Sequence, residues 1–401
     1  MKLPSHGHLT YCSNIHPGET WQEVLSSLQT HLPAVKQRVS PDGPMGIGLR
    51  LSNQACIELR QSGIESFLEW MRQHGFYVFT MNGFPYGGFH RQRVKDQVHH
   101  PDWTTDERVV YTNRLFDLLA QMIPKGMDGG ISTSPLSYKP WWVGKQTQDV
   151  LREATKNLIK VVKHLHQYHQ EQGILLHLDI EPEPDGLIEN SKETVDYFQE
   201  WLLPLGQKEL VAALDVSDKD AAEIILRHIT VCYDVCHFAV GYESPLEVMK
   251  RFVEAGIRIG KIQISSALKC DFTNYQHSRE QYVDAFKSLD EPTYLHQVVA
   301  RDSGNQLHQF QDLPDALKHI NQPDVVEWRT HFHVPVFIGS YGLLQSTQGD
   351  IQEVLQLWSE SPMTSHLEVE TYTWEVLPKE LQTEINTSIA RELNWVTEQL
   401  K

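Results

Sequence analysis

The protein has 401 residues, of which 35 are Lys or Arg and 52 are Asp or Glu, so its formal net charge is -17. A charge this negative argues against nonspecific binding to nucleic acids or anionic membranes, because such binding depends on clustered Lys and Arg facing phosphates. With 40% hydrophobic residues, the chain can bury a large core, which excludes a mostly disordered protein.

The amino-terminal residues 1–18 lack the charged and then apolar run of a signal peptide. No stretch offers the roughly 18 uninterrupted apolar residues that a membrane span needs. We therefore expect a cytoplasmic protein without membrane insertion. The five cysteines are odd in number and sparse, which predicts free thiols. Cys232 and Cys236 form one close pair, but a thiolate zinc site would need a second pair.

Amphipathic helices alternate with short apolar stretches along the chain. Capping-box patterns predict helix starts at Thr20, Ser62, Thr104 and Ser244, each with Glu three residues later. Helical periodicity also covers residues 147–169, 219–228, 350–358 and 383–400. The predicted strands are residues 9–13, 46–51, 76–81, 130–134, 174–181, 229–235, 261–265, 328–337 and 366–372.

This alternation predicts an α/β fold, a single (β/α)8 TIM barrel over residues 1–401, because parallel strands need helical crossovers. The candidates exceed the eight barrel strands by one. We therefore interpret residues 268–334, with a hairpin around 302–305, as an elaborated loop before the last barrel strand. A doubly wound open sheet is the alternative, but Gly46-Ile47-Gly48 lacks the third glycine of a dinucleotide fingerprint.

The later predicted strands carry ionisable residues on one of their two faces. His177, Asp179 and Glu181 alternate with apolar residues along one strand, although a buried parallel strand should be almost wholly apolar. A buried cluster of this kind needs a cation, an ion-pair network or protonation. Its carboxylate and imidazole groups suit Mn²⁺, Zn²⁺, Co²⁺ or Mg²⁺. The metal-free alternative is that Lys261 and Arg329 pair with the deeper carboxylates Asp179 and Glu368.

The order of these residues from about Ile174 to Tyr372 resembles the metal-ligand series of the xylose isomerase-like TIM barrels, which include sugar epimerases and endonuclease IV. The matching segments are Glu-Pro-Glu-Pro after one strand, Asp-x-x-His after the next, His-x-His later and a closing Glu. The resemblance implies a divalent metal with these ligands: Glu181, Asp234, Gln263, His331, His333 and Glu370. Gln263 stands where many members have His or Asp, so it either coordinates through its amide oxygen or orients the substrate.

Three segments are similar, more narrowly, to the EboE family of metabolite traffic proteins: Asn82–His90, Leu178–Pro184 and Leu367–Trp374. This similarity extends over the full length. It implies a role in handling or exporting a secondary-metabolite precursor, with a small-molecule metabolite as the partner.

By analogy with the sugar isomerases and epimerases, the metal would polarise a substrate carbonyl and stabilise an enediolate. The resemblance then assigns proton transfer to Glu181 and Glu370 and contact with a substrate oxygen to His237. The glycine-rich loop would line the pocket through Asn82, Tyr86 and His90, or would only pack. Two other functions stay open, which are a carrier without turnover and a nuclease like endonuclease IV, and the net charge of -17 disfavours the nuclease.

Overall fold

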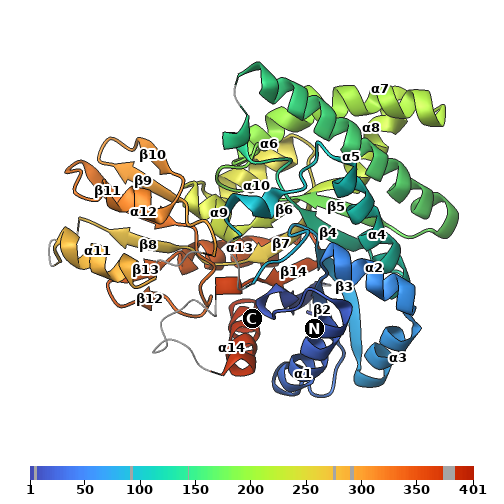
Figure 1. Ribbon diagram of the computed structural model, residues 1–401, viewed down its shortest axis with the longest axis horizontal. Coiled ribbons are helices and arrows are strands. Elements are labelled where there is room, and N and C mark those ends of the chain that lie inside the picture. Colours follow the sequence, from blue (N-terminus) through green and yellow to red (C-terminus); the bar gives the residue numbers. More distant parts are fainter. Residues whose placement is uncertain (4–6, 91–93, 143, 274–276, 290–292, 374–383) are drawn as a thin grey trace.

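The computed structural model describes residues 1–3, 7–90, 94–142, 144–273, 277–289, 293–373 and 384–401 (Figure 1). Its larger sheet has eight parallel strands in the order β1-β14-β7-β6-β5-β4-β3-β2. These strands are β1 (His8–Tyr11), β2 (Met45–Arg50), β3 (Phe76–Asn82), β4 (Gly129–Thr133), β5 (Leu176–Ile180), β6 (Ile229–Asp234), β7 (Ile259–Ile264) and β14 (His366–Val369).

The edge strands β1 and β2 lie side by side and close the sheet into a barrel. A backbone bridge joins Cys12 to Gly48. The hydroxyl of Thr10 donates to the carbonyl oxygen of Gly46 at 2.8 Å and accepts from the amide of Gly48 at 3.1 Å. The strand order and direction confirm the predicted TIM barrel.

Helices surround this barrel (Figure 1). They are α1 (Trp21–Val39), α2 (Asn53–Ser62), α3 (Glu65–His74), α4 (Asp106–Met122), α5 (Lys145–Gln172), α6 (Ser191–Tyr197), α7 (Leu203–Leu214), α8 (Asp218–His228), α9 (Val235–Val240), α10 (Pro245–Glu254), α13 (Gln348–Glu360) and α14 (Ile385–Gln399). A π-helical segment, Phe198–Leu202, joins α6 to α7. Within the described part of the chain, every helix is too short or too polar to traverse a lipid bilayer.

The capping patterns predict some helix starts correctly and others incorrectly. Thr20 forms the predicted capping box at the start of α1. Ser62 does not cap a helix, because it ends α2 before Gly63, whose φ is 84°; the helix predicted there begins at Glu65 as α3 and ends before Gly75. Thr105 rather than Thr104 caps α4, since the hydroxyl of Thr104 donates to a neighbouring aspartate instead.

A second sheet lies beside the barrel, between β7 and β14 in sequence (Figure 1). Its six strands follow the order β10-β9-β11-β8-β13-β12, and their pairings are antiparallel. They are β8 (Leu268–Asp271), β9 (Val298–Asp302), β10 (Leu307–Phe310), β11 (Val325–Thr330), β12 (Ser340–Tyr341) and β13 (Leu344–Ser346), with the helices α11 (Arg279–Lys287) and α12 (Leu313–Leu317). The predicted strand 328–337 therefore begins in this sheet, and residues 331–334 leave it.

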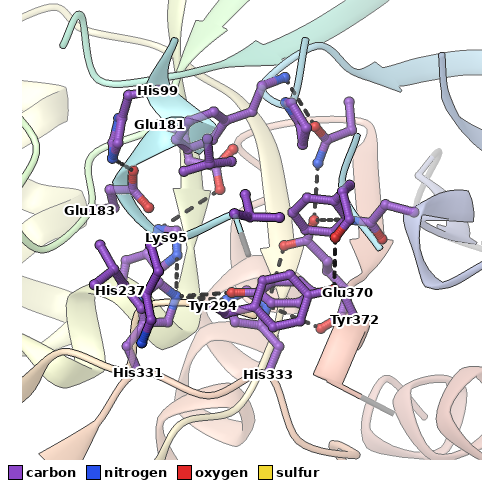
Figure 2. Close-up of a pocket in the computed structure, with 18 of the residues that line it drawn as sticks. Lys95, His99, Glu181, Glu183, His237, Tyr294, His331, His333, Glu370 and Tyr372 are labelled. Atoms are coloured by element: carbon purple, nitrogen blue, oxygen red, sulfur yellow. Dashed lines mark hydrogen bonds and ion pairs between the residues drawn. The ribbon is translucent and has the colours of Figure 1, made fainter. Parts of the chain in front are cut away.

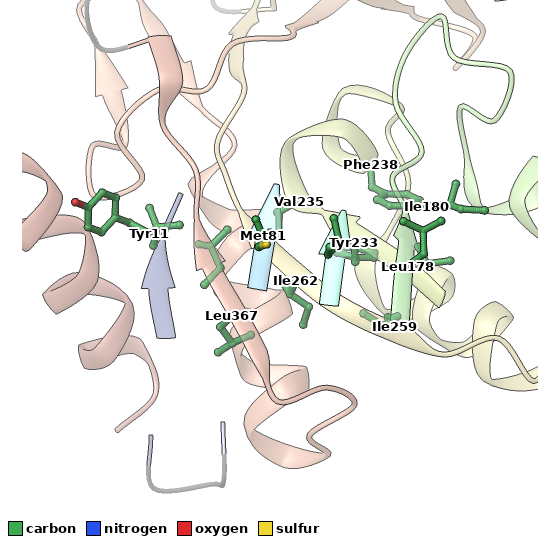
Figure 3. Close-up of a cluster of buried hydrophobic side chains, with 14 of the residues drawn as sticks. Tyr11, Met81, Leu178, Ile180, Tyr233, Val235, Phe238, Ile259, Ile262 and Leu367 are labelled. Atoms are coloured by element: carbon green, nitrogen blue, oxygen red, sulfur yellow. The ribbon is translucent and has the colours of Figure 1, made fainter. Parts of the chain in front are cut away.

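The two faces of the barrel strands differ in polarity, as predicted. Apolar side chains such as Leu178, Tyr233 and Leu367 are buried in the hydrophobic core, part of which Figure 3 shows. The alternate residues point into the barrel. A side chain at Gly130 or Gly260 would overlap His177 and Asp179, so these glycines make room for polar groups inside the barrel.

Candidate functional site

Three carboxylates meet where β5, β6 and β14 end. Glu181 follows β5, Asp234 ends β6 and Glu370 follows β14. One oxygen from each lies within 4.8 Å of the other two, and the three residues are at most 3% exposed. The predicted strand ends therefore bring these carboxylates together, in an arrangement that fits a divalent cation.

Two of the carboxylate oxygens are left unsatisfied. Asp234 Oδ1 accepts hydrogen bonds from the hydroxyl of Ser265 at 2.6 Å and from the amide of His237 at 3.1 Å. Asp234 Oδ2 and Glu181 Oε2 have no hydrogen-bond partner among the described residues. Buried polar atoms are rarely left without a partner, so these two oxygens suit a bound cation.

Glu370 is held by three amide side chains. Asn14 and Asn82 donate to its Oε1 at 2.7 and 3.0 Å, and the amide nitrogen of Gln263 donates to its Oε2. The amide oxygen of Gln263 accepts from the thiol of Cys232 at 2.9 Å. Gln263 thus positions Glu370 and does not border the pocket. Its role as a metal ligand stays a prediction.

Three imidazole rings converge beside the carboxylates. His331 Nε2 lies 3.2 Å from His237 Nε2 and 3.3 Å from His333 Nε2. The Nδ1 atom of His237 donates to the carbonyl oxygen of Pro182 at 3.1 Å, and that of His331 donates to the side-chain oxygen of Gln297 at 2.8 Å. Because both acceptors are carbonyl oxygens, the protons of neutral His237 and His331 lie on Nδ1. Their Nε2 lone pairs then face each other, with the Tyr372 hydroxyl 3.4 Å from His331 Nε2, and a cation or a proton between the two rings would stabilise this arrangement.

Burial and neighbouring charges separate the protonation states of these groups. Burial lowers the pKa of His237, and burial together with the neighbouring His237 and His333 lowers the pKa of His331. Burial raises the pKa of Glu181, and the charges of Glu370 and Asp234 raise it further. Burial opposes ionisation of Glu370 as well, but the hydrogen bond and charge of His333 bring its pKa to about 2. Without metal, these surroundings therefore favour the protonated form of Glu181 and the ionised form of Glu370.

A deeper layer of the barrel contains the ion pair that the metal-free alternative proposed, but only in part. Lys261 pairs with Glu368, both fully buried, and it also donates to the hydroxyl of Ser132 at 3.3 Å. Arg329 lies on β11 in the second sheet and pairs with Glu327 at 2.8 Å. It does not reach the carboxylates inside the barrel, because the segment that carries it belongs to the other sheet.

The carboxylate and imidazole groups open into a pocket whose empty space, with the open solvent at its mouth included, is about 580 Å³ (Figure 2). Aromatic side chains form part of its wall, and polar groups form its floor. The lining includes Asn14, Asn82, Phe84, Phe89, Lys95, His99, Glu181, Glu183, His237, Tyr294, Gln297, His331, His333, Glu370 and Tyr372. A pocket with a few converging polar groups and apolar walls suits a small-molecule ligand.

Two residues predicted to line the pocket lie outside it. The ring of Tyr86 packs edge-on against Tyr111, with ring centroids 5.0 Å apart, and borders a separate hollow. His90 Nε2 donates to the carbonyl oxygen of Asn14 at 2.6 Å and borders another hollow. Asn82, by contrast, lines the pocket. Trp374, in the third segment of the resemblance, lies outside the described residues.

The structure adds residues that sequence reasoning missed. Asn14 follows β1, and the end of that predicted strand was a signal for it. Glu183, the second glutamate of the Glu-Pro-Glu-Pro segment after β5, lines the pocket, and its Oε1 lies 3.3 Å from His99 Nε2. Gln297 precedes β9 and orients His331, and no motif marked it because the second sheet brings it there.

No known family model matches the chain, and no curated protein matches it in sequence. Its fold is similar to a xylose isomerase-like TIM barrel protein from Mycobacterium smegmatis in complex with magnesium, with 10% identity, a TM-score of 0.51 and coverage of 100% of this chain and 98% of the other. An IolI protein with a bound zinc atom gives 12% identity, a TM-score of 0.49 and coverage of 98% and 99%. A D-tagatose 3-epimerase-like protein has 11% sequence identity to this chain and a TM-score of 0.49, and the match covers 98% of both chains. The first likeness supports a xylose isomerase-like TIM barrel fold.

Proposed function

We propose that the protein is a metal-dependent, isomerase- or epimerase-like barrel that acts on a small polyhydroxylated or carbonyl metabolite, with an EboE-like role in metabolite traffic. The observation that carries this proposal is the pocket floor, where two unsatisfied carboxylate oxygens lie beside facing imidazole nitrogens. The three sequence segments quoted above support the narrower role in metabolite traffic.

The donor set fits a divalent metal. Glu181, Asp234 and Glu370 would hold one ion through oxygen atoms, and the adjacent Nε2 atoms of His237, His331 and His333 would suit a second ion that accepts nitrogen ligands. When bound at the carboxylates, such an ion supplies Lewis acidity towards a substrate carbonyl and its neighbouring hydroxyl. Asn14, Asn82 and Gln263 hold Glu370 in place for this task.

The two glutamates suit opposite halves of a proton transfer. While no metal is bound to its oxygens, Glu181 favours its protonated form and is suited to give a proton. Glu370 favours its ionised form and is suited to accept one. Environments that push two pKa values apart are the usual way to create an acid and a base in one site. Where no second ion is bound, the Nε2 lone pair of His237 is available to accept a hydrogen bond from a substrate hydroxyl.

Metal analysis of the purified protein tests the first step. We expect at least one equivalent of Mn²⁺, Zn²⁺, Co²⁺ or Mg²⁺ after dialysis, and a loss of that equivalent in Glu181→Gln and Asp234→Asn. Glu209→Gln, an exposed change on α7, is the matched control and should bind as the parent does. Equal metal content in the three variants would refute the carboxylate site.

Solvent exchange separates an enzyme from a carrier. An isomerase or epimerase should introduce deuterium from D₂O at a carbon next to the carbonyl of its substrate, in a panel of aldoses and ketoses, and Glu370→Gln should abolish this. The carrier alternative is favoured by Gln263, whose amide is engaged by Glu370 and Cys232 and does not face the pocket. A carrier would retain metabolite binding without deuterium uptake, and mass spectrometry of a co-purifying metabolite would identify the bound compound.

A further inference from the structure

A second group of metal-ligating side chains lies at the opposite end of the barrel, where the strands begin. Asp128 precedes β4, His177 lies near the start of β5 and His366 begins β14. One donor atom from each lies within 4.8 Å of the other two. These residues take no part in the proposed reaction at the other end.

The distances between the Asp128 oxygens and the two histidine Nε2 atoms are longer than those of a typical hydrogen bond. Asp128 Oδ2 lies 3.6 Å from His177 Nε2, and Asp128 Oδ1 lies 3.5 Å from His366 Nε2. Both histidines are fully buried, yet neither Nε2 atom has a hydrogen-bond partner among the described residues. Ligand atoms around a tetrahedral zinc with bonds of about 2.0–2.2 Å stand about 3.3–3.6 Å from one another. The two Asp128–histidine separations fall in or at the edge of that range, each to a different carboxylate oxygen, and all three donors lie within 4.8 Å of one another.

The surroundings orient His177 as a ligand. Its Nδ1 lies 2.6 Å from Asp179 Oδ1, and Thr230 donates to the same carboxylate oxygen. A carboxylate on Nδ1 is the usual outer partner of a zinc-bound histidine, because it fixes the ring and leaves Nε2 for the metal. Gly130 and Gly260 leave space that a side chain would take from His177 and Asp179.

We infer that Asp128, His177 and His366 form a second metal site of the Zn²⁺ class at the amino-terminal end of the barrel. Asp128 is 30% exposed and borders a surface hollow lined by residues 123–128 and 172–175, which gives the ion a path from solvent. Water completes the coordination from that side. Since β5 and β14 are not neighbours in the sheet, the bound ion would cross-link strands that share no hydrogen bonds.

The competing explanation is a metal-free ion pair. A protonated His177 between Asp128 and Asp179 would also be stable, and although burial works against that charge, the two carboxylates raise the pKa of His177 to about 9. The two explanations differ in whether Zn²⁺ binds, so a direct measurement of the metal decides between them.

The experiment compares Zn²⁺ binding to the full-length protein, Asp128→Asn and Asp42→Asn. Asp42 is an exposed aspartate in the segment between α1 and β2, so its variant is a matched control. We expect Asp128→Asn to lose one Zn²⁺ equivalent, with affinity at this site falling about 100-fold or more, while Asp42→Asn keeps it. Equal stoichiometry in all three proteins would overturn the inference.

Anomalous diffraction from zinc-soaked crystals of the parent protein provides a second measurement that does not depend on how a variant folds. A peak within bonding distance of Asp128, His177 and His366 supports the site, and no peak there, with zinc at the other end or not, overturns it. Glu181→Gln separates the two sites, because it should reduce metal at the carboxylates and leave this peak unchanged.

Discussion

Two layers of the barrel interior treat buried charge in different ways. In the deeper layer, Lys261 neutralises Glu368 and also donates to Ser132, so the charges balance within the protein. At the end of the strands, Glu181 and Asp234 keep oxygens without partners. Burial is nearly equal in the two layers, so the difference lies in the available partners. Glu368 Oε1 also lacks a hydrogen-bond partner, but Glu368 has the ammonium group of Lys261 beside it, whereas Glu181 and Asp234 have no Lys or Arg partner among the described residues.

The largest expected effect comes from removing the charge of Lys261 from its ion pair with Glu368 in the deeper layer. Lys261→Met leaves Glu368 buried without its cation and should lower the free energy of unfolding by about 3–5 kcal/mol. Urea denaturation measures this loss. The double variant Lys261→Met with Glu368→Leu should recover most of it, because both charges are then absent. A single variant as stable as the parent would show that the deeper layer is not held by this pair.

Glu392 is a third kind of buried carboxyl group, which neutral hydrogen-bond donors hold instead of a cation. Glu392 on α14 accepts hydrogen bonds from the hydroxyl of Thr371 at 2.6 Å and from the amide of Val336 at 3.1 Å. Burial raises its pKa from 4.5 to about 7. The folded state therefore holds the proton more tightly than the unfolded state, so this stabilisation is full below about pH 4.5 and is lost as the pH rises through 7.

The resulting loss of stability by pH 8 is about 3 kcal/mol at most, and Glu392→Gln should remove it. Urea denaturation at pH 5 and pH 8 provides the check. The variant should match the parent at pH 5 and exceed it at pH 8. An unchanged slope with pH would mean that Glu392 ionises normally in the folded protein.

Among the carboxylates at the strand ends, which are Glu181, Asp234 and Glu370, removing one ionisable group should stabilise the metal-free protein. Glu181→Gln replaces a carboxyl group whose pKa is raised by burial and by two carboxylates, so we expect a gain of about 1–2 kcal/mol at pH 8 in the presence of a chelator. Thermal unfolding with and without Mn²⁺ measures it, with Glu209→Gln as control. Opposite behaviour, a loss in chelator, would show that Glu181 already has a favourable partner.

The smallest expected effect concerns a single hydroxyl group. Ser265→Ala removes the 2.6 Å hydrogen bond to Asp234 Oδ1 and the acceptor of the Cys236 amide at 2.9 Å. The free energy of unfolding should fall by about 1 kcal/mol, and metal affinity should fall about tenfold because the ligand is less well oriented. Calorimetric titration of metal into the variant tests this. Full affinity would indicate that the amide of His237 orients Asp234 without help.

The barrel could be predicted from sequence because its strands and helices have distinct hydrophobic periods. The sequence pattern predicts a loop in place of the second sheet, since β10 is mostly exposed and β12 and β13 are very short. Strands of that kind carry no strong alternation, and their pairing depends on contacts distant in sequence. The helix α2 was missed as well, although Ser52 caps it through the amide of Ala55.

The site could be predicted as far as strand ends determine it. Glu181, Asp234 and Glu370 meet because parallel strands end at one edge. The directions of Gln263, Tyr86 and His90 depend on side-chain packing, which a sequence pattern does not specify. Gln297 reaches His331 through the register of β9 and β11, where the amide of His331 donates to the carbonyl oxygen of Gln297 at 2.8 Å.

The contact between β1 and β2 affects where the barrel opens locally. Side-chain oxygens of Thr10 and Ser13 bind the amides of Gly48 and Arg50 along this seam, in place of a continuous ladder between main chains. Hydroxyl groups are easier for water to replace than backbone carbonyls held in a regular sheet. Deuterium should therefore enter the amides of Gly48 and Arg50 sooner than the amides in the middle of β5 and β6. The contact between β1 and β2 is then the place where the barrel opens first in local unfolding.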